Sequence, residues 1–208
     1  PESLGNRLNE SKCDREGRLW IGTMRDYGLA TTGALYRIDR ELSCKRMLHD
    51  ITVPNATCLS PDNRTMYFAD SLDRRVMQAD YDAATARVAN VREFARLSTT
   101  TGVLDGSIVD ADDCLWNAVW GQGRLQRYSA DGALIREVLV AATNTTCPAF
   151  GGTDLTDLYV TSSRLELDAD ALARLPHAGG VFHLVPGVRG VADTLFPDTG
   201  TAAVRPVG

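Results

Sequence analysis

Three polar side chains near the start of apolar segments offer the oxygen ligands of a hard metal ion. They are Asp105, Asn55 and Asn9, and Arg7 lies two residues before Asn9. A carboxylate and two carboxamides suit Ca²⁺, Mg²⁺ or Mn²⁺, and three such ligands leave positions open for water and substrate. Asp105 would then serve both as a metal ligand and as the base that accepts a proton from water. Arg7 would hold an oxygen-rich substrate.

Each of these residues also has a purely structural interpretation. Asp105 begins an Asp-Gly pair, which is common in turns, and Asn55 follows a proline and would cap a turn. Arg7 has Glu10 and Glu2 nearby in the chain as ion-pair partners.

Two aromatic residues are candidates for the apolar walls of the same site. Trp120 follows the segment that contains Asp105, and Tyr27 follows an apolar segment early in the chain. Large aromatic side chains also pack in protein cores, so packing is the alternative role for both.

A repeat in the chain indicates how these residues are positioned. Four segments combine a turn that contains Asp with an apolar segment that contains an aromatic residue. The aromatic residues Trp20, Tyr67, Trp116 and Tyr159 are separated by 47, 49 and 43 residues. A period of about 40–50 residues with several short strands in each unit is typical of a β-propeller blade. The sequence therefore predicts an all-β protein with about four blades.

The strand ahead of each aromatic strand is expected to be the innermost one of its blade. These strands are predicted at residues 9–13, 56–60, 106–110 and 146–150. The residues that open these strands or come just before them would converge on the central channel, which places Asn9, Asn55 and Asp105 at equivalent positions around one axis. The last unit is expected to have outer strands at 179–185 and 194–196. A helix predicted at 167–175 would interrupt it as an insertion or lid.

Composition narrows the class of protein. The chain has 208 residues, 44% of them hydrophobic and 24% charged, with a net charge of -5. We expect a single domain over residues 1–208, with no nucleic-acid or membrane partner. The five cysteines form no CxxC pair and lie in or beside apolar segments, and no secretory signal is seen at the front. We therefore expect reduced core cysteines in a cytoplasmic protein. The three histidines show no metal-ligand spacing.

Several motifs together resemble the SMP-30/gluconolactonase/LRE family, the regucalcin-like six-bladed β-propellers. They lie at residues 7–14 with 17–24, 33–39, 54–62 with 66–71, 104–106 with 115–116 and 120–124, and 147–152 with 158–162 and 187–190. Nearly the whole chain is covered, and the motifs are specific in combination.

The resemblance implies an activity and a set of roles. The activity would be hydrolysis of a sugar lactone, of the gluconolactone or pentonolactone type, to its aldonic acid with one divalent cation (Ca, Zn, Mn or Mg). The ligand asparagine of the family falls on Asn55, and its ligand-and-base aspartate falls on Asp105. Its substrate-contacting residues fall on Arg7 and Asn9.

The chain also departs from the family pattern. Residues 9–11 read Asn-Glu-Ser rather than Asn-Asp-Gly, residues 55–57 read Asn-Ala-Thr rather than Asn-Gly-Leu, and residues 104–106 read Leu-Asp-Gly rather than Pro-Asp-Gly. The first metal ligand of the family is a glutamate in an N-terminal blade, and neither Glu2 nor Glu10 matches it. We therefore expect an incomplete six-bladed propeller that lacks the first blade or so.

Two other functions stay open at this stage. One is a propeller esterase or phosphotriesterase, and the other is a non-catalytic propeller remnant that folds partially or binds a partner through open edges. A panel of substrates would separate the first from a sugar lactonase.

Overall fold

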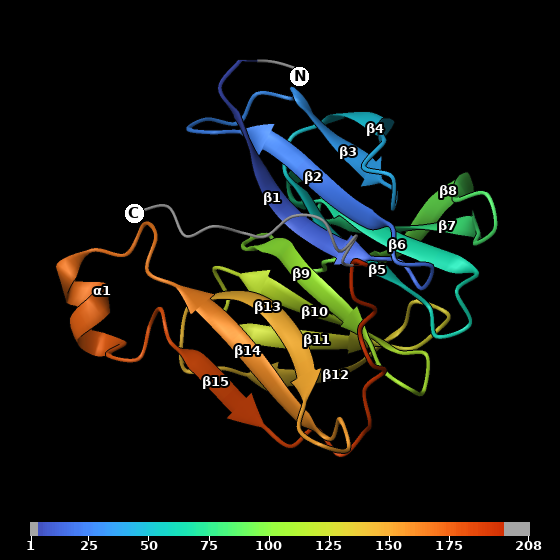
Figure 1. Cartoon of the computed structure of the whole chain (residues 1–208). Helices are drawn as coiled ribbons and strands as arrows, with labels where there is room; N and C mark the ends of the chain where they lie inside the picture. Colours follow the sequence, from blue (N-terminus) through green and yellow to red (C-terminus); the bar gives the residue numbers. More distant parts are fainter. Residues whose placement is uncertain (1–3, 198–208) are drawn as a thin grey trace, which may run out of the picture.

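The computed structural model describes residues 4–197, which form four antiparallel sheets around a central axis (Figure 1). Blade 1 contains β1 (Asn6–Cys13), β2 (Leu19–Arg25), β3 (Gly33–Ile38) and β4 (Cys44–Ile51), and blade 2 contains β5 (Pro54–Leu59), β6 (Thr65–Asp70), β7 (Arg75–Asp82) and β8 (Arg87–Arg96). Blade 3 contains β9 (Val103–Val109), β10 (Leu115–Trp120), β11 (Arg124–Tyr128) and β12 (Leu134–Leu139), and blade 4 contains β13 (Asn144–Gly151), β14 (Asp157–Ser163) and β15 (Val181–Leu184). The predicted all-β fold and four-blade arrangement are confirmed.

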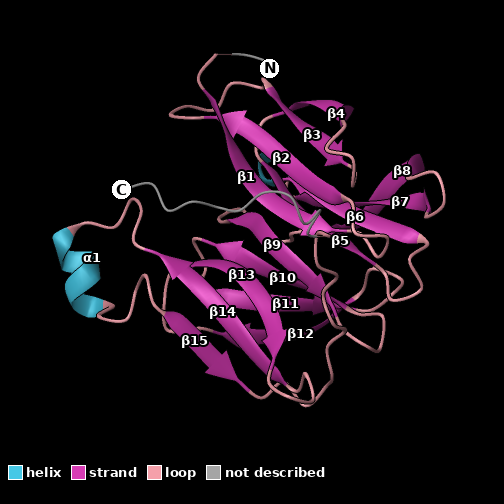
Figure 2. Ribbon diagram, viewed as in Figure 1, coloured by secondary structure: helices cyan, strands magenta, loops and turns pink. Residues whose placement is uncertain are grey.

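The first strand of each blade lies innermost. β5 contacts both β1 and β9, and β9 contacts β13, so these four strands line the axis of the arrangement. The apolar cores lie between neighbouring blades; one core cluster joins residues of blades 2 and 3, and another joins blades 1 and 2. Strands dominate the ribbon drawing (Figure 2), and α1 (Ala169–Arg174) stands apart from the sheets.

The predicted strand at 194–196 is wrong, because blade 4 has three strands. Residues 191–197 instead run past the ends of the inner strands toward blade 1. The carbonyl oxygen of Ala192 accepts a hydrogen bond from Arg15, and Asp193 forms an ion pair with Lys12 at 2.6 Å. Contacts with blade 1 thus replace sheet pairing in this segment.

The aspartates of the repeat hold the turns between the first two strands of blades 1 and 3. Asp14 accepts a hydrogen bond from the indole N–H of Trp20 at 3.2 Å, and Asp110 accepts one from Trp116 at 2.8 Å. Arg18 and Arg127 pair with these two buried carboxylates. A buried carboxylate is tolerated when it is paired and hydrogen-bonded. The repeated pattern of an Asp followed by an aromatic residue therefore indicates a hydrogen bond that holds the turn between the first two strands of a blade, called the blade-closing contact below.

Every inner strand has a β-bulge near its start. The irregularities lie between Leu8 and Ser11, Asn55 and Cys58, Leu104 and Ser107, and Thr145 and Pro148. A bulge leaves residues outside the ladder and re-aims their side chains. The predicted polar segments ahead of the inner strands are therefore parts of the strands themselves, since β1, β5, β9 and β13 begin before the residues expected to precede them.

The bulges correct the predicted equivalence of the three site residues. Asn9 and Asp105 occupy the first bulge position of blades 1 and 3, but Asn55 is the last paired residue before the bulge of blade 2. The corresponding bulge residue in blade 2 is Ala56, which has a left-handed φ of 57°. Counting back from the turn hides this difference, because the paired stretch between the bulge and the turn, Cys58–Leu59, is one residue shorter than Ser11–Cys13 and Ser107–Val109.

Two other expectations have mixed outcomes. The helix predicted at 167–175 is present as α1, with Asp168 as its N-cap and Leu175 as its C-cap. All five cysteines are free, but the expectation that they are core residues is wrong for Cys44 and Cys147, which are exposed. Cys147 occupies a bulge of β13, where the strand leaves the ladder. Over residues 4–197, the only helices are too short to cross a membrane.

Candidate active site

A cavity of about 480 Å³ opens at the starting ends of the inner strands. Arg7 and Asn9 of β1, Asn55 of β5, Asp105 of β9 and Trp120 of β10 all line it. The structure thus brings together residues from three blades that are up to 113 positions apart in the chain, from Arg7 to Trp120. A concave site with a few convergent polar groups is the usual form of a small-molecule site.

Asp105 is the carboxylate at the inner strands of this cavity, while exposed Glu166 lies at its rim. Its Oδ1 accepts a hydrogen bond from the backbone N–H of Gly106 at 3.0 Å. Among residues 4–197 no cationic side chain forms an ion pair with it. Burial therefore raises the pKa of Asp105 to about 7, and the Gly106 hydrogen bond offsets this only in part. A carboxyl group that titrates near neutral pH is suited to accept a proton from water.

The two asparagines are in contact beside Asp105. Asn9 Nδ2 donates to Asn55 Oδ1 at 3.2 Å and to the carbonyl oxygen of Pro54 at 3.0 Å. Asn55 Nδ2 donates to Ser71 Oγ at 2.9 Å, so the amide plane of Asn55 is fixed with its oxygen toward Asn9. Both carboxamide oxygens are therefore held in defined directions at the cavity wall.

Arg7 reaches the same group from the rim. Its Nη1 donates to Asn9 Oδ1 at 3.1 Å, and its Nε lies 3.4 Å from a carboxylate oxygen of Asp26. The ion-pair partner of Arg7 is therefore Asp26 rather than Glu10, while Glu2 lies outside the described residues. An exposed ion pair of this kind contributes little free energy, so it leaves Arg7 available to a ligand.

Only one of the two aromatic candidates lies at the cavity. Trp120 is half-buried and lines the cavity, whereas Tyr27 does not line it and is 94% exposed in the turn after β2. Tyr27 has a left-handed φ of 53°, so that turn carries its ring outward. Apolar lining comes instead from residues that include Met24, Leu72 and Leu165.

The segment before α1 forms part of the cavity rim. Leu165 and Glu166 line the cavity, while α1 itself buries no residue. Buried Asn144 donates to the carbonyl oxygen of Leu165 at 2.8 Å and anchors this segment to blade 4. The predicted lid is therefore the short stretch that leads into the helix.

Sequence reasoning missed two residues behind the site, buried Asn117 and half-buried Glu10. Asn117 of β10 donates from Nδ2 to the carbonyl oxygen of Asp105 and to Ser107 Oγ, both at 2.8 Å. Glu10 accepts a hydrogen bond from the backbone N–H of Thr57 at 2.7 Å. Burial raises the pKa of Glu10 to about 8. The signal for Glu10 was its place directly after Asn9, but a charged residue on a strand usually faces solvent.

The donor set fits a hard divalent cation better than a thiophilic one. It consists of one carboxylate without a cationic partner and carboxamide oxygens held by neighbours. Within residues 4–197, no group of three or more His, Cys, Asp and Glu side chains is placed to hold a metal ion. A cation here would therefore use Asp105 and Asn55 together with water or substrate oxygens.

Antiparallel sheets of three or four strands around an axis, with a cavity that contains a few polar groups where the inner strands begin, define a β-propeller with a small-molecule site. The model of the SMP-30/Gluconolactonase/LRE-like region matches residues 1–164. The chain therefore belongs to the SMP-30/gluconolactonase/LRE-like family.

Individual relatives agree with this membership. An L-arabinolactonase of Azospirillum brasilense is 42% identical over 200 residues, covering 94% of this chain and 65% of the relative. The putative sugar lactone lactonase of Rhizobium meliloti (strain 1021) is 38% identical, with 94% and 66% covered. The solved structure of the calcium-binding protein regucalcin from Agrobacterium tumefaciens superposes with a TM-score of 0.88 at 37% identity, covering 93% of this chain and 65% of that one. The chain thus spans about two thirds of the length of these relatives.

Proposed function

We propose that the protein, as part of a propeller of this family, hydrolyses a sugar lactone to the corresponding aldonic acid with the help of one divalent cation. The observation that carries the proposal is Asp105, a carboxylate in the cavity with a pKa raised to about 7 and no cationic partner among the described residues. The similarity to proteins named L-arabinolactonase and sugar lactone lactonase supports the choice of substrate class.

The side chains divide the work as follows. Asp105 accepts a proton from the water that attacks the lactone carbonyl carbon. The bond between that carbon and the ring oxygen then breaks, and the ring oxygen takes the proton from Asp105 and leaves as a hydroxyl group of the aldonic acid. Arg7 donates hydrogen bonds to hydroxyl or ring oxygens of the sugar, and Asn9 Oδ1 accepts one from a sugar hydroxyl, so the two residues orient the ring. Trp120 and the apolar lining pack against the C–H face of the ring and exclude water from the rest of the cavity.

A divalent cation would be held by Asp105 and Asn55. When bound, it supplies positive charge that stabilises the oxygen developing negative charge in the ester carbonyl. The same charge favours the ionised form of Asp105, which keeps the base in its active state at neutral pH.

The test is proton release from gluconolactone and from pentonolactones, measured with the chain after EDTA treatment and again with added Ca²⁺, Mn²⁺, Zn²⁺ or Mg²⁺. We expect turnover that requires a cation and is lost in Asp105→Asn. The matched control is Asp80→Asn, since Asp80 lies on an outer strand and is paired with Arg92. Equal rates for the chain, for Asp105→Asn and for buffer alone would overturn the proposal. Turnover of phosphotriesters or aryl esters in preference to lactones would assign a different ester hydrolase.

A further inference from the structure

Glu10 is a half-buried carboxylate of blade 1 that contacts the inner strands of blades 2 and 3. It belongs to the bulge of β1, and its Oε2 accepts the backbone N–H of Thr57 in β5 at 2.7 Å. The backbone N–H of Ser107 in β9 also interacts with this carboxylate and lowers its pKa, as the Thr57 amide does. The net effect of its surroundings is the opposite, because burial is the largest influence and Asp105 adds a like charge.

The two amides occupy corresponding places with respect to the site. Thr57 follows Asn55 by two residues within the bulge of β5, and Ser107 follows Asp105 by two residues at the end of the bulge of β9. Thr57 and Ser107 are both buried, so water does not satisfy their backbone groups. The peptide geometry that sets the direction of each site residue is therefore fixed from behind by one side chain.

We propose that Glu10 is a positioning residue that holds the bulges of β5 and β9, and through them aims Asn55 and Asp105 into the cavity. This inference rests on the proposed function of that cavity. It differs from the roles of Arg7 and Asn9, because Glu10 does not line the cavity and acts through the backbone of its neighbours.

The chemistry of the side chain explains why a carboxylate is needed. The ionised carboxylate, which predominates above the raised pKa of about 8, offers acceptors in every direction and no donor, and it therefore matches two backbone N–H groups from two strands. A glutamine of the same shape would turn its NH₂ group toward one of these N–H groups. An aspartate would keep both acceptors and fall short by one methylene group.

The experiment compares Glu10→Gln and Glu10→Asp with the control Glu93→Gln. Glu93 lies on outer strand β8 and pairs with Arg96, so the control makes the same chemical change away from the inner strands. Amide hydrogen exchange is measured over residues 55–59 and 105–109, with calcium affinity by calorimetry and lactone kcat and KM on the same samples.

In Glu10→Gln we expect faster exchange in both segments. We also expect calcium affinity and kcat to fall by about 10–100-fold, the usual effect of losing a residue that orients a ligand. KM should change less than kcat, because Arg7 lies outside both bulges. Glu10→Asp should lie between the chain and Glu10→Gln, and it decides the question if Glu10→Gln does not fold.

Two results would overturn the inference. One is exchange in both segments equal to that of Glu93→Gln, and the other is faster exchange with calcium affinity and kcat unchanged, which would make Glu10 a residue of the fold alone. If the unmodified chain binds no calcium and opens no lactone, the proposed function fails. The hydrogen exchange data then still show whether Glu10 holds the two bulges, so the two failures are distinguishable.

Discussion

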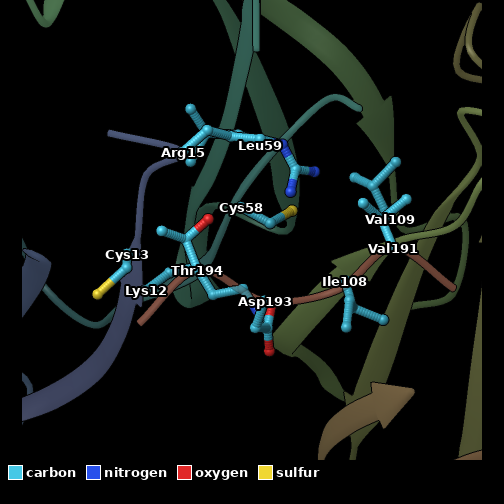
Figure 3. Close-up of a pocket in the computed structure, with 10 residues that line it drawn as sticks. All are labelled: Lys12, Cys13, Arg15, Cys58, Leu59, Ile108, Val109, Val191, Asp193 and Thr194. Atoms are coloured by element: carbon cyan, nitrogen blue, oxygen red, sulfur yellow. The ribbon is translucent and has the colours of Figure 1, made fainter. Parts of the chain in front are cut away.

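The two ends of the inner strands differ in whether their carboxylate has an ion-pair partner. At the starting end, a cavity of about 480 Å³ contains Asp105 without an ion-pair partner among the described residues. At the other end, a cavity of about 20 Å³ is lined by Lys12 and by Val191, Asp193 and Thr194 of the C-terminal segment, as Figure 3 shows. There Lys12 and Asp193 form an ion pair at 2.6 Å.

The end of the inner strands with the small cavity, called the closed end below, is therefore stabilised by an ion pair, whereas the end with the large cavity contains a carboxylate that is available for chemistry. Burial of an isolated carboxylate costs free energy unless a cation or hydrogen bonds compensate it. Asp14, also buried, shows full compensation: burial alone would raise its pKa, but hydrogen bonds from Tyr81, Arg18 and Trp20 outweigh that effect and lower it. Asp105 has no such set of donors, and a strongly perturbed group in a cleft is a mark of a functional site.

The strongest test of this contrast is the pair Asp105→Asn and Asp193→Asn. Asp105→Asn should lower lactone turnover by about 10²–10⁴-fold, the usual contribution of a general base, and Asp193→Asn should leave it unchanged. Rates from proton release under saturating cation provide the measurement.

The same pair makes an opposite prediction for stability. Without cation at pH 8, Asp105→Asn should raise the free energy of unfolding, since it removes a half-buried charge that no cation compensates. Urea unfolding monitored by tryptophan fluorescence gives this value. A loss of stability in Asp105→Asn would contradict this prediction, because it would mean that a stabilising interaction compensates the charge of Asp105.

The second prediction concerns pH. The pKa values of Asp105 and Glu10 are raised in the folded state, to about 7 and about 8, above ordinary values of 3.8 and 4.5. The folded chain therefore holds these protons more tightly than the unfolded chain, so stability is highest below the unfolded values. It declines as pH rises through the folded values. We expect the cation-free chain to lose a few kcal/mol between pH 5 and pH 9.

Bound calcium should change this dependence of stability on pH. A bound cation favours ionised Asp105, so added Ca²⁺ should reduce the loss at high pH. Thermal unfolding in EDTA and in Ca²⁺ over this pH range is the measurement, and the double variant Asp105→Asn with Glu10→Gln is the control that should flatten the profile. A stability that rises from pH 5 to pH 9 in EDTA would contradict the assignment.

Sequence periodicity predicted the architecture well because the blade repeat leaves a local signal. Each blade-closing aspartate lies within a few residues of its aromatic partner, as Asp14 and Trp20 do. The strand at 194–196 was mispredicted because this segment does not pair with the strands of blade 4 that precede it in the sequence. Their partners lie in blade 1, as the contact between Asp193 and Lys12 shows.

The site was predicted less completely. The stretch between the bulge and the turn is one residue shorter in blade 2, so Asn55 lies one position before the bulge, which no count along the chain reveals. Tyr27 was placed at the cavity from its residue type, whereas its backbone conformation directs it to solvent. Glu10 and Asn117 act on backbone groups of other strands, and such contacts have no fixed spacing in a sequence.

The third prediction tests the support behind Asp105. Asn117→Ala removes hydrogen bonds to the carbonyl oxygen of Asp105 and to Ser107 Oγ. The buried acceptors would lose their donor, so we expect destabilisation by about 1–3 kcal/mol and a fall in turnover beyond what the lost stability explains. Asn144→Ala is the control, since it removes one comparable hydrogen bond from buried Asn144 to Leu165. Equal turnover in both variants, measured well below their unfolding temperatures, would contradict a special role for Asn117.

The smallest effect is expected at the closed end, from Asp193→Asn. Its carboxylate is about half exposed and its partner Lys12 is more buried, at 55% and 23% side-chain exposure. Ion pairs with such access to water contribute about 0–1 kcal/mol, and salt screens them. Urea unfolding at low and high ionic strength should therefore show a loss below about 1 kcal/mol that shrinks in 1 M NaCl. A loss of several kcal/mol that persists in salt would mean that this ion pair closes the inner strands as a buried contact. The Lys12–Asp193 ion pair would then be essential for the fold, and the two ends would differ only in whether the charge of the carboxylate is compensated.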